Sequence, residues 1–347
     1  MNKLTVLTIT ILTSAFLMTS CSGLAVAGKK NVATTQTEQQ KVKKVSKETI
    51  DFTKKPNESG KIMVLMYHNI GSTEKEWVRT PENFTKDMNT LYEKGYRPIS
   101  LTDYVKGNID VGQGFTPVVI TFDDGNGNNF EYLPDGTISK TSAVGLLLDF
   151  HEQHKDFPLE ATFFVCGDLP FGQKGMESKK MNLIIEKGMD IGNHTVDHPI
   201  LNSLPADKLQ KEIGAQAQFL QKLISKEGYV INTIALPFGS RPKDKNLTQY
   251  LQTGSYNGVA YNNIAILNVG SNPGFSPYDT RFNNLNIPRV RASEMKVDNV
   301  GMYNYIQYFD KHPEEKYISD GASDIITVPK AKANLVKTPS GKELYTY

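Results

Sequence analysis

Short apolar runs alternate with helical patterns along the sequence from Lys61 onward. Strands that are separated by helices pair in parallel through crossover connections, so this alternation predicts an α/β fold with a mostly parallel sheet. About eight strands over roughly 250 residues is the size of a (β/α) barrel, and a doubly wound open sheet is the alternative. The predicted strands are residues 62–67, 97–99, 118–122, 161–165, 189–191, 232–236, 258–261 and 287–290.

The first predicted helix carries clear boundary signals. Thr80 can cap its N-terminus, and Pro81 occupies the first helical position. Apolar residues then recur at i, i+4, i+7 and i+8 from Phe84, and Gly95 ends the pattern. A second pattern of this kind follows Pro205. We therefore expect crossover helices between the strands.

The N-terminal residues have the layout of an export signal. Residues 4–18 form an uncharged, mostly apolar run behind Lys3, and this run is short for a membrane span. We predict a signal peptide over residues 1–20 and a protein that acts outside the cytoplasm. The chain has 2 cysteines, Cys21 and Cys166, so no internal disulfide framework is expected.

Two processing routes suit this signal. Leu-Met-Thr-Ser-Cys at residues 17–21 resembles a bacterial lipobox, with Met18 in place of the usual Leu. Ala-Val-Ala at residues 25–27 would instead suit ordinary signal peptidase. We favour a lipoprotein that is anchored to the membrane by lipid on Cys21, with full secretion as the alternative.

Charge is unevenly spread along the chain, whose formal net charge is +2. Lysines are concentrated in residues 29–61, which leaves a mildly acidic remainder, a poor polyphosphate binder, so we expect no nucleic-acid partner. Residues 21–58 lack any periodicity and are predicted to be a disordered tether. We expect one barrel domain over residues 59–311, and a C-terminal tail or wrap over residues 312–347.

Polar residues follow directly after several predicted strands. The carboxyl ends of parallel strands meet at one edge of the sheet, so these residues are the first candidates for a functional site. They are His68 after the first strand, Asp-Asp-Gly at 123–125 after the third, His-Thr-Val-Asp-His at 194–198 after the fifth, and Pro-Phe-Gly at 237–239 after the sixth.

His194 and His198 are four residues apart, which on a helical turn would place both imidazoles on one side, within reach of a single ion. A carboxylate from another strand end would complete a set that leaves positions open for water, as hydrolytic zinc requires. With two adjacent carboxylates, Asp123 and Asp124, one can bind the ion while the other takes a proton. Taken alone, Asp-Asp-Gly is also ordinary turn chemistry.

Thr-Phe-Asp-Asp-Gly at residues 121–125, together with His-Thr-Val-Asp-His at residues 194–198, resembles the first two motifs of the polysaccharide deacetylases, carbohydrate esterase family 4 with its NodB-like domain. The resemblance spans about residues 61–290. It implies a distorted (β/α) barrel, here of seven or eight parallel strands as a single catalytic domain. It also implies removal of acetyl groups from N-acetylglucosamine polymers or acetylated xylan with a divalent metal ion, for which we expect Zn²⁺.

Positions that match the family motifs imply roles. Asp123 would be the general base, and Asp124, His194 and His198 the metal ligands. Phe238 would supply a backbone N–H to the oxyanion, because Leu-Pro-Phe-Gly at residues 236–239 keeps the aromatic turn of the third motif. The Arg that usually precedes this turn is missing.

A second departure concerns the general acid. The usual late Leu-His motif is absent, and Met-Tyr-His at residues 66–68 instead resembles the circularly permuted biofilm-polysaccharide branch, which makes His68 the candidate acid. First and last strands are neighbours in a closed barrel, so such a permutation is feasible. Arg289, Arg291 and Arg241 are candidates to orient Asp123, and we favour Arg289.

Other residues have an ordinary structural explanation beside a functional one. Trp77, Tyr278 and Phe275 lie in predicted loops where a sugar ring could stack, although packed loop anchors are the simpler interpretation. His151 and His154 fit a solvated helix end. Cys166 fits buried filler better than a nucleophile.

The sequence thus predicts a metal-dependent hydrolase that removes N-acetyl groups from a GlcNAc-containing extracellular or cell-wall polysaccharide, acting on a carbon–nitrogen bond other than a peptide bond. One alternative is a catalytically impaired glycan-binding lipoprotein, which the missing Arg favours and the complete acid and histidine set opposes. Another is an O-acetyl esterase that acts on a xylan-like polymer.

Overall fold

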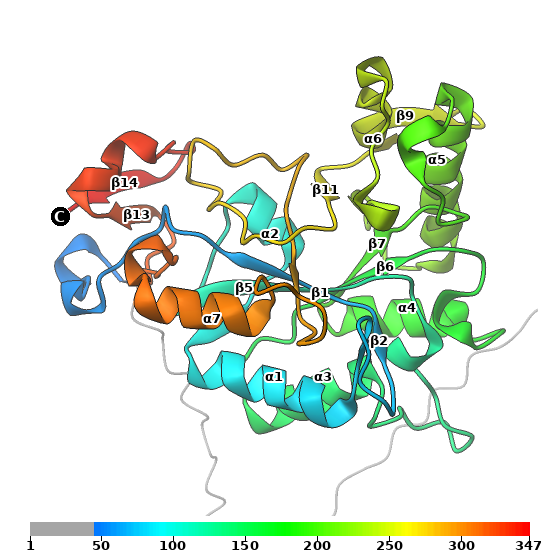
Figure 1. The fold of residues 1–347 in the computed structure, drawn as a ribbon, viewed down its shortest axis with the longest axis horizontal. Helices are drawn as coiled ribbons and strands as arrows, with labels where there is room; N and C mark the ends of the chain where they lie inside the picture. The colour runs from blue at the N-terminus through cyan, green and yellow to red at the C-terminus, as the bar shows by residue number, and fades with distance from the viewer. Residues whose placement is uncertain (1–44) are drawn as a thin grey trace, which may run out of the picture. The chain divides into compact units, whose positions relative to one another are not determined.

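The computed structural model describes residues 45–347 (Figure 1). Its centre is an 8-stranded parallel sheet with the order β11-β8-β7-β6-β5-β1-β12, and β4 pairs with β5 on the edge opposite to β1. The strands of this sheet are β1 (Met63–Tyr67), β4 (Tyr96–Pro98), β5 (Thr116–Phe122), β6 (Thr162–Val165), β7 (Asp190–Asn193), β8 (Thr233–Ala235), β11 (Ala265–Leu267) and β12 (Val290–Arg291).

One segment joins the two edges of this sheet. β12 pairs in parallel with β1, with Val290 opposite Leu65. Just before β12, Ile287 forms a parallel bridge with Leu267 of β11, and its N–H donates to the Ile266 carbonyl at 2.9 Å. Because this segment contacts both edges, the sheet curves into a distorted (β/α) barrel. The predicted fold class is confirmed.

One predicted strand forms outside the barrel sheet. Residues 258–261 belong to a separate antiparallel hairpin of β9 (Thr253–Tyr256) and β10 (Val259–Asn262). The barrel position next to β8 is taken by β11 instead. The apolar run at β11 is the four residues between Asn263 and Asn268, and so short a run does not identify a strand by periodicity.

Helices cover the outside of the barrel. They are α1 (Pro81–Glu93), α2 (Leu101–Lys106), α3 (Ala143–Gln153), α4 (Glu177–Glu186), α5 (Ala206–Leu223), α6 (Gln249–Gln252) and α7 (Met302–Lys311). α1 begins as predicted, with the Thr80 hydroxyl accepting from the N–H of Asn83 at 3.2 Å. Within residues 45–347, no helix combines the length and apolar character needed to cross a membrane.

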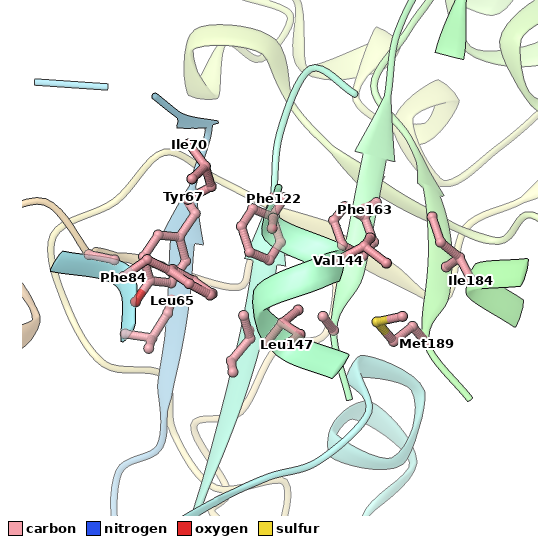
Figure 2. Packing of buried hydrophobic residues seen from close by; sticks show 14 of the residues in the cluster. Leu65, Tyr67, Ile70, Phe84, Phe122, Val144, Leu147, Phe163, Ile184 and Met189 are labelled. Atoms are coloured by element: carbon pink, nitrogen blue, oxygen red, sulfur yellow. The ribbon is translucent and has the colours of Figure 1, made fainter. Parts of the chain in front are cut away.

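The largest core cluster lies between the sheet and the helices α1, α3 and α4. Figure 2 shows Tyr67, Phe122 and Phe163 from three neighbouring strands, with Val144 of α3 beside them. The rings of Phe122 and Phe163 stack with centroids 4.8 Å apart. This packing fixes the ends of β1 and β5, which are followed by His68 and by Asp123 and Asp124.

Residues 45–58, which the sequence assigned to the disordered tether, are folded. They form two short 3-10 helices, Lys47–Thr49 and Phe52–Lys54, and then reach Glu58, which is buried. The boundary was misplaced because the partners of this segment lie more than 250 residues away, as in the hydrogen bond from Tyr317 Oη to Glu58 Oε1 at 3.0 Å. Residues 1–44, with the predicted signal and Cys21, lie outside the described residues.

The C-terminal residues are a wrap. β13 (Ile325–Val328) pairs in parallel with β14 (Glu343–Thr346), and buried Ile326 and Val328 join a second core cluster. In Figure 1 the blue start of the described chain lies beside these red strands, and the rings of Phe52 and Tyr347 are 4.9 Å apart. The two ends of the described chain therefore pack together.

Two further short strands complete the fold. β2 (Asn69–Ile70) and β3 (Val78–Arg79) form a parallel pair directly after β1. The loop between them carries Trp77. It is tied down by Arg79, which is buried and pairs with Glu74 at 2.7 Å.

Candidate active site

The residues predicted from the strand ends meet at one mouth of the barrel. A cavity of about 450 Å³ opens there. It is lined by His68, Asn69, Trp77, Asp123, Asp124, His194, His198, Phe238 and Val269. Six of these nine residues are the predicted base, acid, metal ligands and oxyanion donor, so the structure brings together side chains from β1, β5, β7 and β8 as expected.

Asp124, His194 and His198 form a set of three potential metal ligands. Nε2 of His194 lies 3.4 Å from Asp124 Oδ1, and Nε2 of His198 lies 3.6 Å from the same oxygen. Two ligands that are each about 2.1 Å from a zinc ion at the tetrahedral angle stand about 3.4 Å apart. The donor types and their spacing therefore fit a divalent ion such as zinc.

The prediction that the two histidines lie on a helical turn was wrong. Residues 194–198 form an irregular loop in which Thr195 and His198 adopt positive φ values of 68° and 50°. The two imidazoles still converge, with ring centroids 4.8 Å apart. Nδ1 of His194 lies 2.8 Å from the carbonyl of Ala235 and must donate to it, which leaves Nε2 of the neutral ring as the metal-binding atom.

The Asp-Asp-Gly turn aims Asp124 at the histidines. Asp124 itself has a φ of 73°, and Gly125 follows with 67°. A Cβ on Gly125 would come within 2.8 Å of a methyl group of Val165, so glycine is required by space as well as by conformation. Asn126 donates to Asp124 Oδ2 at 3.2 Å, and Oδ1 faces the imidazoles.

Asp123 is buried beside this set and pairs with Arg289. The guanidinium donates from Nη1 to Oδ1 at 2.7 Å and from Nη2 to Oδ2 at 2.6 Å. Both side chains are at most 1% exposed. A planar guanidinium that binds both oxygens fixes the plane of the carboxylate. The prediction that Arg289 orients Asp123 is supported by this contact.

The other two arginines bind elsewhere. Arg291 pairs with Glu76 at 2.9 Å and lies 4.7 Å from the ring of Trp77. Arg241 donates to Oδ1 of Asn268 at 2.9 Å. Of the three candidates, Arg289 is therefore the one that contacts the predicted base.

Opposing effects set the charges of the site. Burial would raise the pKa of Asp123, but the Arg289 guanidinium and His194 outweigh it and hold that pKa well below its usual value. Burial also opposes ionisation of Asp124, yet His194 keeps its pKa below the ordinary range. Burial lowers the pKa of His68, and the Asp123 and Asp124 charges only partly offset it. Both carboxylates are therefore ionised at neutral pH in the metal-free protein.

His68 and Phe238 line the cavity beside this charged set. Nε2 of His68 lies 4.0 Å from Asp123 Oδ2, and its ring is 4.6 Å from that of Trp77. Its Nδ1 is buried without a hydrogen-bond partner in the described structure. Phe238 has a φ of 56°, is 64% exposed, and its ring lies 4.7 Å from His198.

Some residues considered from the sequence lie away from the cavity. Tyr278 is buried and donates to the carbonyl of Gly107 at 2.8 Å. Phe275 lies under Arg281, and His151 and His154 stay at the end of α3. Trp77 alone of the three aromatic candidates lines the cavity.

Cys166 lies close to the site without being able to act in it. Its Sγ is 3.4 Å from the carbonyl of Asp124. Burial, followed by the Asp124 charge, raises the pKa of the thiol to about 11, so the nucleophilic thiolate is scarce at neutral pH. Cys166 is half-buried and not fully buried as expected, while its raised pKa argues against a nucleophile, as the sequence interpretation did.

Two wall residues were not predicted. Asn69 follows His68 directly and could have been found by extending the strand-end rule by one residue. Val269 follows β11, the strand that the sequence did not reveal. Missing a strand thus also hid the side chain at its end.

Comparisons with known proteins agree with this geometry. Residues 111–257 match the family model described as polysaccharide deacetylase. The Bacillus subtilis protein YxkH, named provisionally as a polysaccharide deacetylase, is 24% identical over 261 residues, which cover 71% of this chain and 84% of that protein.

Two solved structures share the fold. The deacetylase PplD of Streptococcus pyogenes, solved with acetate, has a TM-score of 0.51 and 20% identity, over 71% of this chain and 97% of that one. IcaB from Ammonifex degensii has a TM-score of 0.50 and 16% identity, over 72% of this chain and 97% of that one.

Proposed function

The chain carries a polysaccharide deacetylase domain, and from this premise we propose that it is a metal-dependent hydrolase that removes N-acetyl groups from a GlcNAc-containing extracellular or cell-wall polysaccharide. The observation that carries the proposal is the ionised, arginine-held Asp123 beside the Asp124, His194 and His198 set in one cavity. Hydrolysis of an amide needs an activated water and a base, and these groups stand where they could supply both.

A divalent ion would be held by Oδ1 of Asp124 and by Nε2 of His194 and His198. When bound, it would supply Lewis-acid chemistry, lowering the pKa of water and polarising the acyl oxygen. Three protein ligands leave coordination positions open, as in catalytic rather than structural zinc sites. We propose zinc because two imidazoles and one carboxylate are typical of its catalytic centres.

Asp123 would accept the proton of the attacking water. Its Oδ2 lies 3.9 Å from Nε2 of His194, adjacent to the ligand set without belonging to it. Pairing with Arg289 keeps the carboxylate ionised and fixed in orientation, the state that a general base requires.

His68 would donate a proton from Nε2 to the departing amine nitrogen. An amide nitrogen leaves poorly unless it is protonated, so this step needs a positioned acid. Burial disfavours protonated His68, and the charge of Asp123 at 4.0 Å favours it. The N–H of Phe238 is the proposed oxyanion donor, by its place in the third-motif turn.

The walls of the cavity favour a sugar polymer. Trp77, Phe238 and Val269 offer apolar surface to a pyranose face and to the acetyl methyl group, and Asn69 offers an amide. An acid at His68 favours amide over ester hydrolysis, because an alcohol leaves more readily than an amine. The similarity of fold to IcaB is compatible with the permuted branch that the His68 motif suggested.

The glycan-binding alternative loses its main argument. It rested on the missing Arg of the third motif, and Arg289 supplies a guanidinium to Asp123 from β12's side of the barrel. Export and lipidation on Cys21 remain proposals that rest on the sequence of residues 1–27.

The test is acetate release from chitooligosaccharides, poly-N-acetylglucosamine, peptidoglycan and acetylated xylan. We expect release from a GlcNAc polymer, loss of activity after chelation, and recovery with zinc. Release from acetylated xylan alone would support the O-acetyl esterase. Binding to a glycan without release from any of the four polymers, with zinc present, would support the impaired binding protein.

A further inference from the structure

The loop that carries both histidine ligands is held from behind by α5. Three consecutive N–H groups of this loop, those of Thr195, Val196 and Asp197, donate to side-chain oxygens. The N–H of Val196 also donates to the backbone carbonyl of Glu212 at 3.2 Å. Thr195 donates to Oδ1 of Asn193 at 2.8 Å. The Asn193 amide in turn donates to the Ile213 carbonyl of α5 at 2.8 Å.

Glu212 of α5 accepts from the other two. Its Oε2 lies 3.1 Å from the N–H of Val196 and 2.9 Å from that of Asp197. Glu212 is only 7% exposed, so water cannot readily replace it as an acceptor. One carboxylate oxygen therefore binds the two residues that stand directly between Thr195 and His198.

Two uncommon backbone conformations flank this contact. Thr195 and His198 both have positive φ, which non-glycine residues rarely adopt unless the surroundings impose it. The contact with Glu212 fixes the backbone between them, and His198 Nε2 is thereby kept 3.6 Å from Asp124 Oδ1. The Glu212 carboxylate is held by N–H groups and belongs neither to the cavity lining nor to the set of potential metal ligands among the described residues.

We infer that Glu212 is a positioning residue for the metal site, which holds His198 in place through the backbone of residues 196 and 197. This inference rests on the proposed function, since it concerns the affinity for the proposed ion. Residues that orient metal ligands from outside the ligand set typically contribute about 10–100-fold to metal affinity. Glu212 acts through the backbone, so we expect the lower end of that range.

The experiment measures zinc affinity by competition with a chromogenic chelator, together with the melting temperature of the metal-free protein. Glu212→Ala is expected to weaken zinc binding about tenfold. Glu212→Gln keeps an oxygen acceptor and should lose less. Gln218→Ala is the control, because Gln218 also lies on α5, is half-buried, and donates to the carbonyl of Tyr256 in β9 at 2.7 Å, away from the histidine loop.

A merely structural role would lower the melting temperature of Glu212→Ala and Gln218→Ala alike and leave zinc affinity unchanged in both; that result would overturn the inference. Weakened zinc binding in Glu212→Ala with wild-type affinity in Gln218→Ala would support it. Should Glu212→Ala not fold, Glu212→Met decides, because it keeps the bulk of the side chain without an oxygen acceptor, and wild-type affinity in that variant counts against the inference. If wild-type protein binds no zinc, the proposed function itself fails.

Discussion

Asp123 at the cavity and Glu58 in the segment before β1 are both almost fully buried, 1% and 2% exposed, yet their surroundings differ. Asp123 faces the Arg289 guanidinium, whereas Glu58 faces a second buried carboxyl group, Asp320. Burial, and then the Asp320 charge, raise the pKa of Glu58 well above its usual value, while the pKa of Asp123 is held low.

The difference shows that burial alone does not decide whether a carboxyl group is ionised. A buried carboxyl group beside a cation stays ionised and can take a proton, as a base must. The pKa of a buried carboxyl group beside another one is raised, and at Glu58 such a group serves as a hydrogen-bond acceptor. Glu58 accepts from Tyr317 Oη and from the N–H of Thr327, so it joins the two chain ends in what we call the terminal clasp, residues 56–61 with residues 313–328.

The largest expected effect is on turnover, and it comes from substituting Asp123 in the cavity. Asp123→Asn removes the proposed base, and we expect a loss of turnover of about 10³-fold. Zinc should stay bound, because Asp123 lies beside the ligand set. The variant also leaves Arg289 buried without its counter-charge, at a cost of about 3 kcal/mol in stability. Acetate release and zinc content are measured well below the melting temperature, and near wild-type turnover would refute the role of Asp123.

His68→Ala tests the acid that faces this base. Removing a positioned acid should lower kcat about 10²-fold. The pH–rate profile of this variant should also lose the limb that reports the titration of His68, because water must then donate the proton. A profile with unchanged shape would show that another group donates the proton. His312→Ala, at an exposed histidine, serves as the control.

Trp77→Ala concerns the wall of the cavity and not its charges. A stacked aromatic contact contributes about 1 kcal/mol, so KM for a GlcNAc oligomer should rise about fivefold with little change in kcat. Steady-state kinetics separate the two constants. A fall in kcat with KM unchanged would instead assign Trp77 to the support of His68, whose ring it contacts.

The smallest effect is expected at the terminal clasp. The stability contribution of Glu58 there depends on pH with the opposite sign to that of Asp123. The folded-state pKa of Glu58 is raised, so its contribution to stability is full below the pKa of the unfolded chain and is lost as the pH rises. Asp123, whose pKa is lowered, loses its contribution as the pH falls. Glu58→Gln should therefore reduce the decline in the free energy of unfolding above about pH 4.5, measured by urea titration, by roughly 1 kcal/mol, without changing turnover. An equally steep decline in both proteins would contradict this assignment.

These two regions also differ in what the sequence could reveal. The residues of the cavity could be predicted from the sequence because they follow apolar strands at their carboxyl ends and because two short motifs occur together. Arg289 was favoured among three candidates, and only the fold, in which β12 returns beside β1, showed which arginine reaches Asp123.

The terminal clasp could not be predicted from the sequence. Glu58 and Thr327 are 269 residues apart, and neither lies in a periodic pattern, so nothing local marks their contact. Glu212 was not predicted for a related reason. In the sequence it is a polar position of an amphipathic helix. Its side chain accepts from backbone N–H groups of a loop, and no residue pattern specifies the shape of that loop. Local periodicity predicts helices and strands, whereas polar contacts between distant residues depend on the tertiary structure.

The most direct test of the account is the zinc stoichiometry of the full chain, compared between the wild type, His194→Ala and the His312→Ala control. The account predicts one equivalent of zinc in the wild type and in the control, and well below one equivalent in His194→Ala. One full equivalent in His194→Ala, or none in the wild type, would contradict the central claim that Asp124, His194 and His198 hold one ion beside Asp123.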